Sequence, residues 1–327
     1  MNAGPWLRSL GLLYAVPEPY RDPRLDTAEA LAVLRCGPDV LAELVAAGLP
    51  RAEGPDGPLF DRHDLINLAL NAGTGASAPE RALRFALRWM RDGPAAWTAP
   101  LAWDFAVEMR AADAAADSRW SHTRFLPELT GGMVETWESS AAVRITPGRF
   151  EFAGPGPIRF AGRMRTAGTL QELRSPALRR IVSDFLGAGY RWAKLPKPCQ
   201  YDTEPILAAG FAPCVTASVH LEKEFRAAGY EAESRGGWIL GMLDLSHSWV
   251  EVVDDDGLVK QIDPVFERLS RYAGDPHPEL GRACLGSRLN RLLPAAIPAG
   301  EPEALHVRAG AAAPAAVSTV IRRSDAR

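Results

Sequence analysis

Hydrophobic residues recur at helical spacing through the first third of the chain. The stretch 26–37, DTAEALAVLRCG, starts with an acidic or hydroxyl cap, continues with an apolar stripe and stops at a glycine. Residues 39–48, 64–73 and 78–93 repeat this order, and residues 102–120 continue the helical pattern. The spacing therefore predicts a mostly helical N-terminal domain, with residues 1–125 as its bounds.

The pattern changes after this helical region. Residues 134–164 alternate between apolar and polar positions and carry Pro-Gly turns at 147–148 and 154–157, which is typical of short strands. Helical spacing returns over 169–189, and a Pro-rich loop, KLPKPCQYDTEP, follows it.

The last part of the chain completes an α+β pattern. A helix is expected over 213–228, and alternating apolar segments continue to about residue 264. We expect a second domain over 126–275 and a C-terminal extension over 276–327. The alanine-rich last twenty residues read as a loosely held tail.

The helix predicted over 213–228 begins with a cysteine. Pro213 suits a first turn, because its missing N–H has no helical partner there, and Gly229 suits the stop. Cys214 begins an apolar stripe with Ala217, Ser218, Leu221, Phe225 and Ala228. The positive end of the helix dipole lowers a thiol pKa and favours the nucleophilic thiolate. On the helix alone, an ordinary core cysteine remains the simpler interpretation.

A histidine and an aspartate follow in a predicted hairpin. His247 lies on the strand before the turn DDDG, and Asp263 ends the strand after it. A three-residue loop, with Gly257 left-handed, places Asp263 opposite Trp249 and diagonal to His247, on the same face of the sheet. A two-residue loop places them on opposite faces. A general base with an orienting carboxylate needs the first arrangement.

Four other readings compete with this set. Cys199 is a rival nucleophile, but it lies in the Pro-rich loop without a helix start behind it. His220 lies about 120° round the helix from Cys214, so we interpret it as structural. Cys199, Cys214, His220 and His247 lack zinc-ligand spacing, and the three acids of the turn are more typical of a solvated hairpin than of a calcium site. We expect no metal and no cofactor.

The ordered stretches PCVTASVHLEKEFRAAGYEAESRGGWILG, SHSWVEVVDDDG and QIDP resemble the core of the transglutaminase-like superfamily. The resemblance covers roughly residues 165–270. It implies a papain-like α+β fold, with the cysteine helix packed on an antiparallel sheet. Carried over by residue, it implies Cys214 as nucleophile, His247 as base and Asp263 as its orienter. The family often has Gly before this cysteine and an aromatic residue after it, whereas this chain has Pro213 and Val215.

The family chemistry implies attack on an acyl carbon, a thioester intermediate and transfer to an amine or to water. The oxyanion would need the Cys214 backbone N–H and one side chain, for which Gln200, Trp192 and Tyr201 are unranked candidates. The apolar side of the cysteine helix, Trp249 on the His247 face and Trp238 on the preceding strand suggest a site that limits water and favours an amine. The same pattern is equally typical of ordinary core packing.

Composition narrows the partners. The chain has 327 residues, is 47% hydrophobic and carries a formal charge of −3, which is ordinary for a globular protein and argues against nucleic acid or an anionic membrane as the main partner. The sequence shows no membrane-spanning run and no signal peptide, and the scattered cysteines suggest reduced thiols in a cytoplasm.

Three functions remain open. The first is an acyltransferase that forms or exchanges an amide bond, in a context such as bacterial natural-product biosynthesis. Its donor would be a peptide, a glutaminyl group or a carrier-protein thioester, its acceptor an amine, and a carrier protein or precursor peptide a further partner. The second is a cysteine peptidase or amidase of the same fold. The third is a binding module without catalysis.

Overall fold

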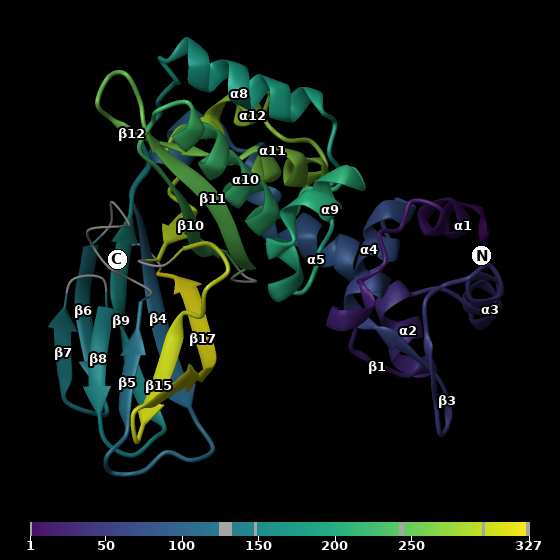
Figure 1. Ribbon diagram of the computed structural model, residues 1–327, viewed down its shortest axis with the longest axis horizontal. Helices are drawn as coiled ribbons and strands as arrows, with labels where there is room; N and C mark the ends of the chain where they lie inside the picture. Colours follow the sequence, from purple (N-terminus) through teal and green to yellow (C-terminus); the bar gives the residue numbers. More distant parts are fainter. Residues whose placement is uncertain (1, 124–132, 147–148, 242–244, 296–297, 325–327) are drawn as a thin grey trace.

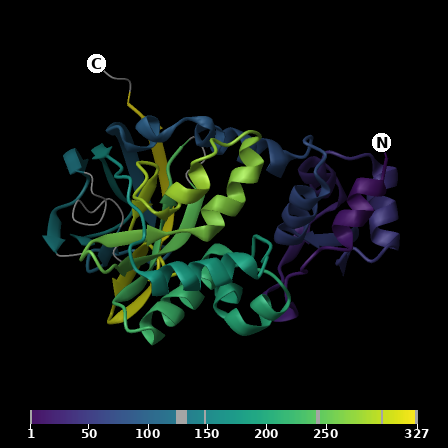
Figure 2. The same ribbon diagram turned by 90° about the horizontal axis from the view of Figure 1, so that it is seen from above.

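The computed structural model describes residues 2–123, 133–146, 149–241, 245–295 and 298–324 (Figure 1). Within them the chain forms a helical N-terminal unit, a sandwich of two antiparallel sheets, and a core in which helices pack on a third large sheet. Figures 1 and 2 show the N-terminal unit at one end of the long axis and the sandwich towards the other. The fold class is therefore α+β, as predicted.

The N-terminal unit contains the four predicted helices as α2 (Thr27–Leu34), α3 (Pro38–Ala46), α4 (Arg62–Ala72) and α5 (Ala78–Ala86), the last of which is shorter than predicted and is followed by the 3₁₀ turn η2 (Arg88–Arg91). The spacing did not predict three further elements, α1 (Gly4–Leu10), the 3₁₀ turn η1 (Glu18–Tyr20) and α6 (Pro94–Thr98). Asp26 and Glu29 form a capping box at the start of α2, so the polar start seen in the sequence supplies the missing hydrogen-bond partners. A small sheet of order β1-β3-β2, from Pro23–Leu25, Gly57–Asp61 and Ala52–Gly54, flanks these helices.

The prediction of helix over residues 102–120 is wrong. This segment forms strand β4 (Leu101–Arg110) and, after a loop, β5 (Arg119–His122). Along β4 buried and more exposed residues alternate, with Trp103 and Phe105 inside and Asp104 outside, which is the two-residue period of a strand. The helical region predicted over 1–125 thus ends at Thr98.

The β-sandwich joins the middle of the chain to its end. One sheet has the order β17-β4-β9-β6 and the other β16-β15-β5-β8-β7. Their remaining strands are β6 (Met133–Ser139), β7 (Val143–Thr146), β8 (Arg149–Ala153), β9 (Ile158–Thr166), β15 (Ala304–Arg308), β16 (Ala311–Pro314) and β17 (Ala316–Arg323). The strands predicted over 134–164 are confirmed. The predicted turn at 147–148 lies outside the described residues.

The expectation of a loose C-terminal tail is also wrong for its described part. Strand β17 pairs with most of β4, from Ala316 opposite Arg110 to Arg323 opposite Trp103. Alanine content suggested a tail, but the run VSTVI in this segment has the β-branched residues that strands favour.

The core sheet has the order β13-β12-β11-β10-β14. Its strands are β10 (Ala232–Ile239), β11 (Leu245–Val253), β12 (Val259–Ile262), β13 (Leu285–Gly286) and β14 (Leu292–Pro294). The surrounding helices are α8 (Pro176–Gly187), α9 (Thr203–Ala208), α10 (Cys214–Ala227), α11 (Pro264–Leu269) and α12 (Leu280–Ala283), with 3₁₀ turns η3 (Pro198–Tyr201) and η4 (Ser270–Ala273). The helix predicted over 169–189 begins only after Ser175, its cap.

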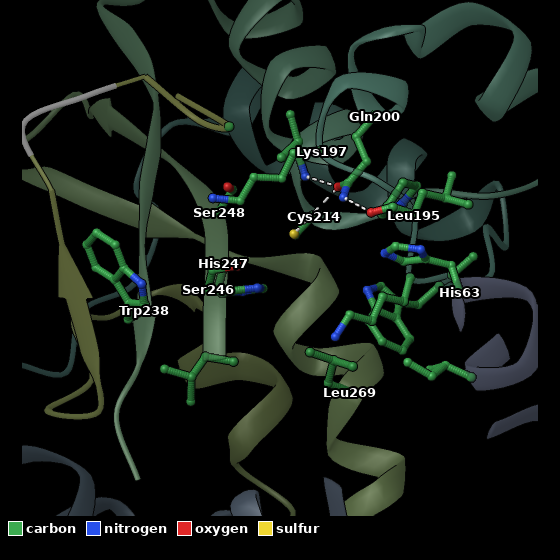
Figure 3. A pocket seen from close by; sticks show the side chains of 18 of the residues that line it. His63, Leu195, Lys197, Gln200, Cys214, Trp238, Ser246, His247, Ser248 and Leu269 are labelled. Atoms are coloured by element: carbon green, nitrogen blue, oxygen red, sulfur yellow. Dashed lines mark hydrogen bonds between the residues drawn. The ribbon is translucent and has the colours of Figure 1, made fainter. Parts of the chain in front are cut away.

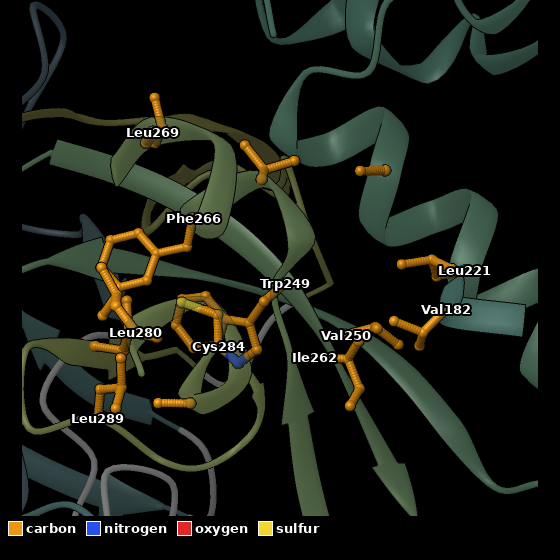
Figure 4. Packing of buried hydrophobic residues seen from close by; sticks show 14 of the residues in the cluster. Val182, Leu221, Trp249, Val250, Ile262, Phe266, Leu269, Leu280, Cys284 and Leu289 are labelled. Atoms are coloured by element: carbon orange, nitrogen blue, oxygen red, sulfur yellow. The ribbon is translucent and has the colours of Figure 1, made fainter. Parts of the chain in front are cut away.

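Helix α10 packs on the core sheet through the stripe seen in the sequence. Leu221 and Phe225 are fully buried in one cluster with Val250 and Ile262 of the sheet, and Phe266 of α11 closes it (Figure 4). Burying such side chains contributes about 1.5–3 kcal/mol each, so the helix that begins with Cys214 is held firmly. Ala228 is exposed at the helix end and does not belong to the buried stripe.

Candidate active site

Cys214 is the first residue of α10 and faces a cavity of about 450 Å³. Pro213 is the N-cap residue, one position earlier than expected, with extended backbone angles. The amide of Cys214 is among the helix N-terminal N–H groups that no helix carbonyl accepts. The side chain is partly exposed, so a reagent can reach the sulfur.

The hairpin after the cysteine helix has the predicted register. Val253 pairs with Val259 and Val250 with Ile262, which places Asp263 opposite Trp249. Gly257 has φ +73°, the left-handed conformation that the three-residue loop requires. The hairpin thereby directs Asp263, just beyond the end of β12, towards His247 on β11.

His247 and Asp263 form a short buried hydrogen bond. The imidazole Nε2 lies 2.6 Å from Asp263 Oδ2, and both side chains are almost fully buried. The other carboxylate oxygen, Oδ1, accepts the Phe266 N–H at 2.8 Å, so Asp263 also caps α11. With Nε2 occupied, Nδ1 is the nitrogen left for Cys214, whose sulfur lies between Gln200 and His247 in Figure 3.

The surroundings favour a charged imidazole. Burial lowers the pKa of His247, but the charge and hydrogen bond of Asp263, together with Cys214, outweigh it and raise the pKa to about 10. An imidazolium next to a thiol stabilises the thiolate, which is the nucleophilic form of cysteine.

The other cysteines lie in different environments. Burial raises the pKa of Cys36, raises that of Cys199 to about 11, and raises that of Cys284 well above its ordinary value. Cys199 is fully buried in a small cluster with Val16 and Phe211 and does not line the cavity. The geometry therefore favours Cys214 over the rival in the Pro-rich loop.

Gln200 is the proposed oxyanion candidate that lies beside the sulfur. Its Oε1 accepts the Val215 N–H at 3.2 Å and lies 3.8 Å from Cys214 Sγ, while its Nε2 donates to the Leu195 carbonyl at 2.8 Å. These two bonds fix the amide and leave one N–H of Nε2 for another acceptor.

The other three candidates differ in position. Trp192 lines the cavity. Tyr201 does not; it is 42% exposed and its hydroxyl donates to the Ala299 carbonyl. Trp249 is a core residue, 1% exposed, whose ring centroid lies 6.1 Å from that of His247. Trp249 thus packs behind the base and does not line the cavity.

The remaining candidates have structural roles. His220 packs on Phe185 with ring centroids 5.9 Å apart, and burial lowers its pKa. In the acidic turn, Asp254 accepts backbone N–H groups of Arg174 and Ser175, and Asp256 pairs with Lys260. In the described part of the chain, no group of three or more His, Cys, Asp or Glu side chains is placed to hold a metal ion.

One wall of the cavity comes from parts of the chain that sequence reasoning did not connect with the site. Arg62 and His63 of α4 and Leu83 of α5 line it from the N-terminal unit. Asn67 of α4 fixes this wall, since its amide donates to the Lys194 carbonyl at 2.9 Å and accepts the Lys194 N–H at 2.7 Å. The paired lysines in KLPK were a visible signal, but nothing in the pattern linked them to residue 62.

Comparisons with known proteins add little. No family profile matches the chain, and no curated protein matches it. One solved structure resembles it, titled "The Crystal Structure of a Putative Cysteine Protease from Cytophaga hutchinsonii", with 10% identity, a TM-score of 0.40 and coverage of 70% of this chain and 93% of that one. None of the helices in the described ranges is long and apolar enough to cross a membrane.

Proposed function

We propose that the chain is a cysteine enzyme with a papain-like, transglutaminase-like core that transfers acyl groups through a thioester on Cys214. The observation that carries the proposal is the buried 2.6 Å hydrogen bond between His247 and Asp263, next to a partly exposed cysteine at a helix N-terminus. A nucleophile, a base and an orienting acid are the parts that acyl transfer requires. Burying a charged pair costs desolvation free energy, and a binding module without catalysis gains nothing from such a pair beside a cysteine.

The proposed reaction has two halves. The Cys214 proton passes to His247 Nδ1, and the sulfur attacks the acyl carbon. The Cys214 N–H and the remaining Gln200 N–H would stabilise the oxyanion, as two donors commonly do. Collapse breaks the bond to the leaving group, which takes the proton from His247 and departs. The acceptor then attacks the thioester, gives its proton to His247 and releases the product, and the thiol is restored.

The acceptor decides between two candidates. The first is an amine, which makes the enzyme an acyltransferase that forms an amide bond. The sequence argument for an amine rested on the apolar face of α10, on Trp249 and on Trp238. Leu221, Phe225 and Trp249 are core residues that do not line the cavity, so they do not limit the access of water to it. Trp238 does line the cavity, and it is the part of that argument that still supports an amine.

The second candidate is a cysteine peptidase or amidase, with water as the acceptor. Arg62, Lys194 and Lys197 line the cavity, and positive charges there repel a protonated amine while leaving water unaffected. This observation favours water over a simple protonated amine as the acceptor.

Partitioning of the thioester tests both candidates. The full chain is incubated with a small acyl thioester, and intact mass spectrometry follows the added acyl mass on Cys214. Increasing amine is then added, and amide is quantified against free acid. Amide that rises with amine concentration supports the transferase; free acid with every acceptor supports the hydrolase. If the protein shows neither acyl mass on Cys214 nor amide or free acid above the level of Cys214→Ala, both candidates are wrong.

A further inference from the structure

The cavity in front of Cys214 has an unbalanced charge. Three cationic residues line it, Arg62 of α4 and Lys194 and Lys197 of the Pro-rich loop, and we call them the cationic wall. Glu301 is the one acid among the described residues that line the cavity. Within the described part of the chain, none of the three cationic side chains forms an ion pair or a side-chain hydrogen bond. His63 also lines the cavity, but burial lowers its pKa, so it adds an N–H and no full charge at neutral pH.

Arg62, Lys194 and Lys197 all keep contact with solvent. Partial desolvation, and secondly the charge of Arg62, nevertheless lower the pKa of Lys194, so the two groups are close enough to repel. The charge of Cys214 acts in the opposite direction on the same lysine, which puts Lys194 within electrostatic reach of the sulfur. The two hydrogen bonds from Asn67 keep the backbone of Lys194 against α4, the helix that carries Arg62. A cluster of like charges at a cavity beside a nucleophile suits an anion that enters with the substrate.

We propose that the cationic wall binds an anionic group of the substrate, a carboxylate or a phosphate, next to the acyl carbon that Cys214 attacks. The position of that carbon rests on the proposed function, whereas anion binding in the cavity does not. Arg62 offers a flat, two-pronged donor surface for such a group, and the lysines act as point charges. The N-terminal unit thereby contributes to substrate recognition through α4.

Two alkylating reagents of nearly equal size test this proposal. Iodoacetate carries a negative charge and iodoacetamide does not; with either, the Cys214 sulfur forms a bond to the CH₂ carbon and iodide leaves. The ratio of their rate constants at Cys214 reports the local potential, because the thiolate fraction affects both rates equally. Glutathione in the same buffer gives the reference ratio for a free thiol.

We expect the ratio of iodoacetate to iodoacetamide rates at Cys214 to exceed that of glutathione. Arg62→Gln, Lys194→Met and Lys197→Gln should each lower it, by roughly three- to tenfold for a partly solvated charge near the reaction site. Lys223→Gln is the matched control, since Lys223 is exposed on α10 outside the cavity. A ratio equal to that of glutathione, and unchanged in the three variants, would overturn the proposal even if Cys214 is highly reactive.

The ratio of alkylation rates tests whether the cavity binds an anion. Protection experiments then identify whether that anion is a phosphate or a carboxylate. Inorganic phosphate or an N-acetyl amino acid is added at increasing concentration during iodoacetamide labelling. Stronger protection by phosphate assigns a phosphorylated substrate, and stronger protection by the amino acid assigns a carboxylate. Slow labelling of Cys214 with an unaltered charge preference would instead count against the proposed function and leave the anion site standing.

Discussion

The two walls of the cavity differ in whether their charged side chains have partners within the protein. On the wall formed by α10 and the β11–β12 hairpin, His247 and Asp263 are buried and paired with each other. On the cationic wall, Arg62, Lys194 and Lys197 form no ion pair with another described residue, and Glu301 is the one described acid that lines the same cavity. The buried His247–Asp263 pair is held in one geometry, which suits a chemical step. The cations of the other wall gain a charge partner only when a substrate binds. The hairpin wall therefore carries the chemistry, and the cationic wall carries the recognition of the substrate.

The largest effect is expected on the hairpin wall. Cys214→Ala should abolish acyl-enzyme formation and turnover, because it removes the sulfur that forms the thioester. Far-UV circular dichroism should stay unchanged, because the substitution removes one sulfur at a partly exposed position. The control variant is Cys36→Ala, which should retain activity. If a folded Cys214→Ala protein still turned over substrate, the nucleophile would be a residue other than Cys214.

Asp263→Asn should reduce kcat/KM by roughly 10³-fold, and by less than His247→Ala. An amide N–H facing Nε2 forces the proton onto Nδ1, where the ring can no longer accept the thiol proton. Asparagine still accepts the Phe266 N–H and caps α11, so stability should change little. Asp263→Ala, which loses the cap as well, should lower stability by about 1 kcal/mol in addition. Equal, total loss for Asp263→Asn and His247→Ala would mean that Asp263 does more than orient the ring.

Asn67→Ala tests how the cationic wall is held. The change removes both hydrogen bonds to the Lys194 backbone and should lower the free energy of unfolding by about 2 kcal/mol, measured in urea. It should also reduce the iodoacetate preference at Cys214, because Lys194 is then free to move away. Asn71→Ala, on the same helix, is the control. A stable Asn67→Ala protein with an unchanged preference would show that this wall is held by other contacts.

Asp64 gives the N-terminal unit its own pH dependence. Burial is the main cause that raises the pKa of this carboxyl to about 6, although Asp64 accepts the Val16 N–H and Arg21 lies 4.0 Å away. The unfolded chain ionises near pH 4, so stability should fall as pH rises from about 4 to 6 and then level off, by on the order of 2 kcal/mol. Asp64→Asn should flatten this part of the stability curve. If the Asp64→Asn protein keeps the same slope of stability against pH, a titratable group other than Asp64 causes it.

The sequence predicts the hairpin wall well because its signals are local. The turn DDDG sets the register, the proline before Cys214 sets the helix start, and both operate within a few residues. The prediction fails over residues 102–120 because this stretch is rich in alanine and charged residues, whose helical preference is overridden when β4 pairs with β17, over 200 positions away. The cationic wall could not be predicted, since its geometry depends on Asn67 bonding a residue 127 positions later.

The central claim is that His247 activates Cys214, and competitive alkylation tests it most directly. The protein is labelled at pH 7 with limiting iodoacetamide, and peptide mapping gives the rate at each of the four cysteines in the native chain and in His247→Ala. We expect Cys214 to react at least tenfold faster than Cys36, Cys199 or Cys284, and we expect this advantage to be lost in the variant. Faster labelling of Cys199, or an unchanged Cys214 rate without His247, would contradict the central claim.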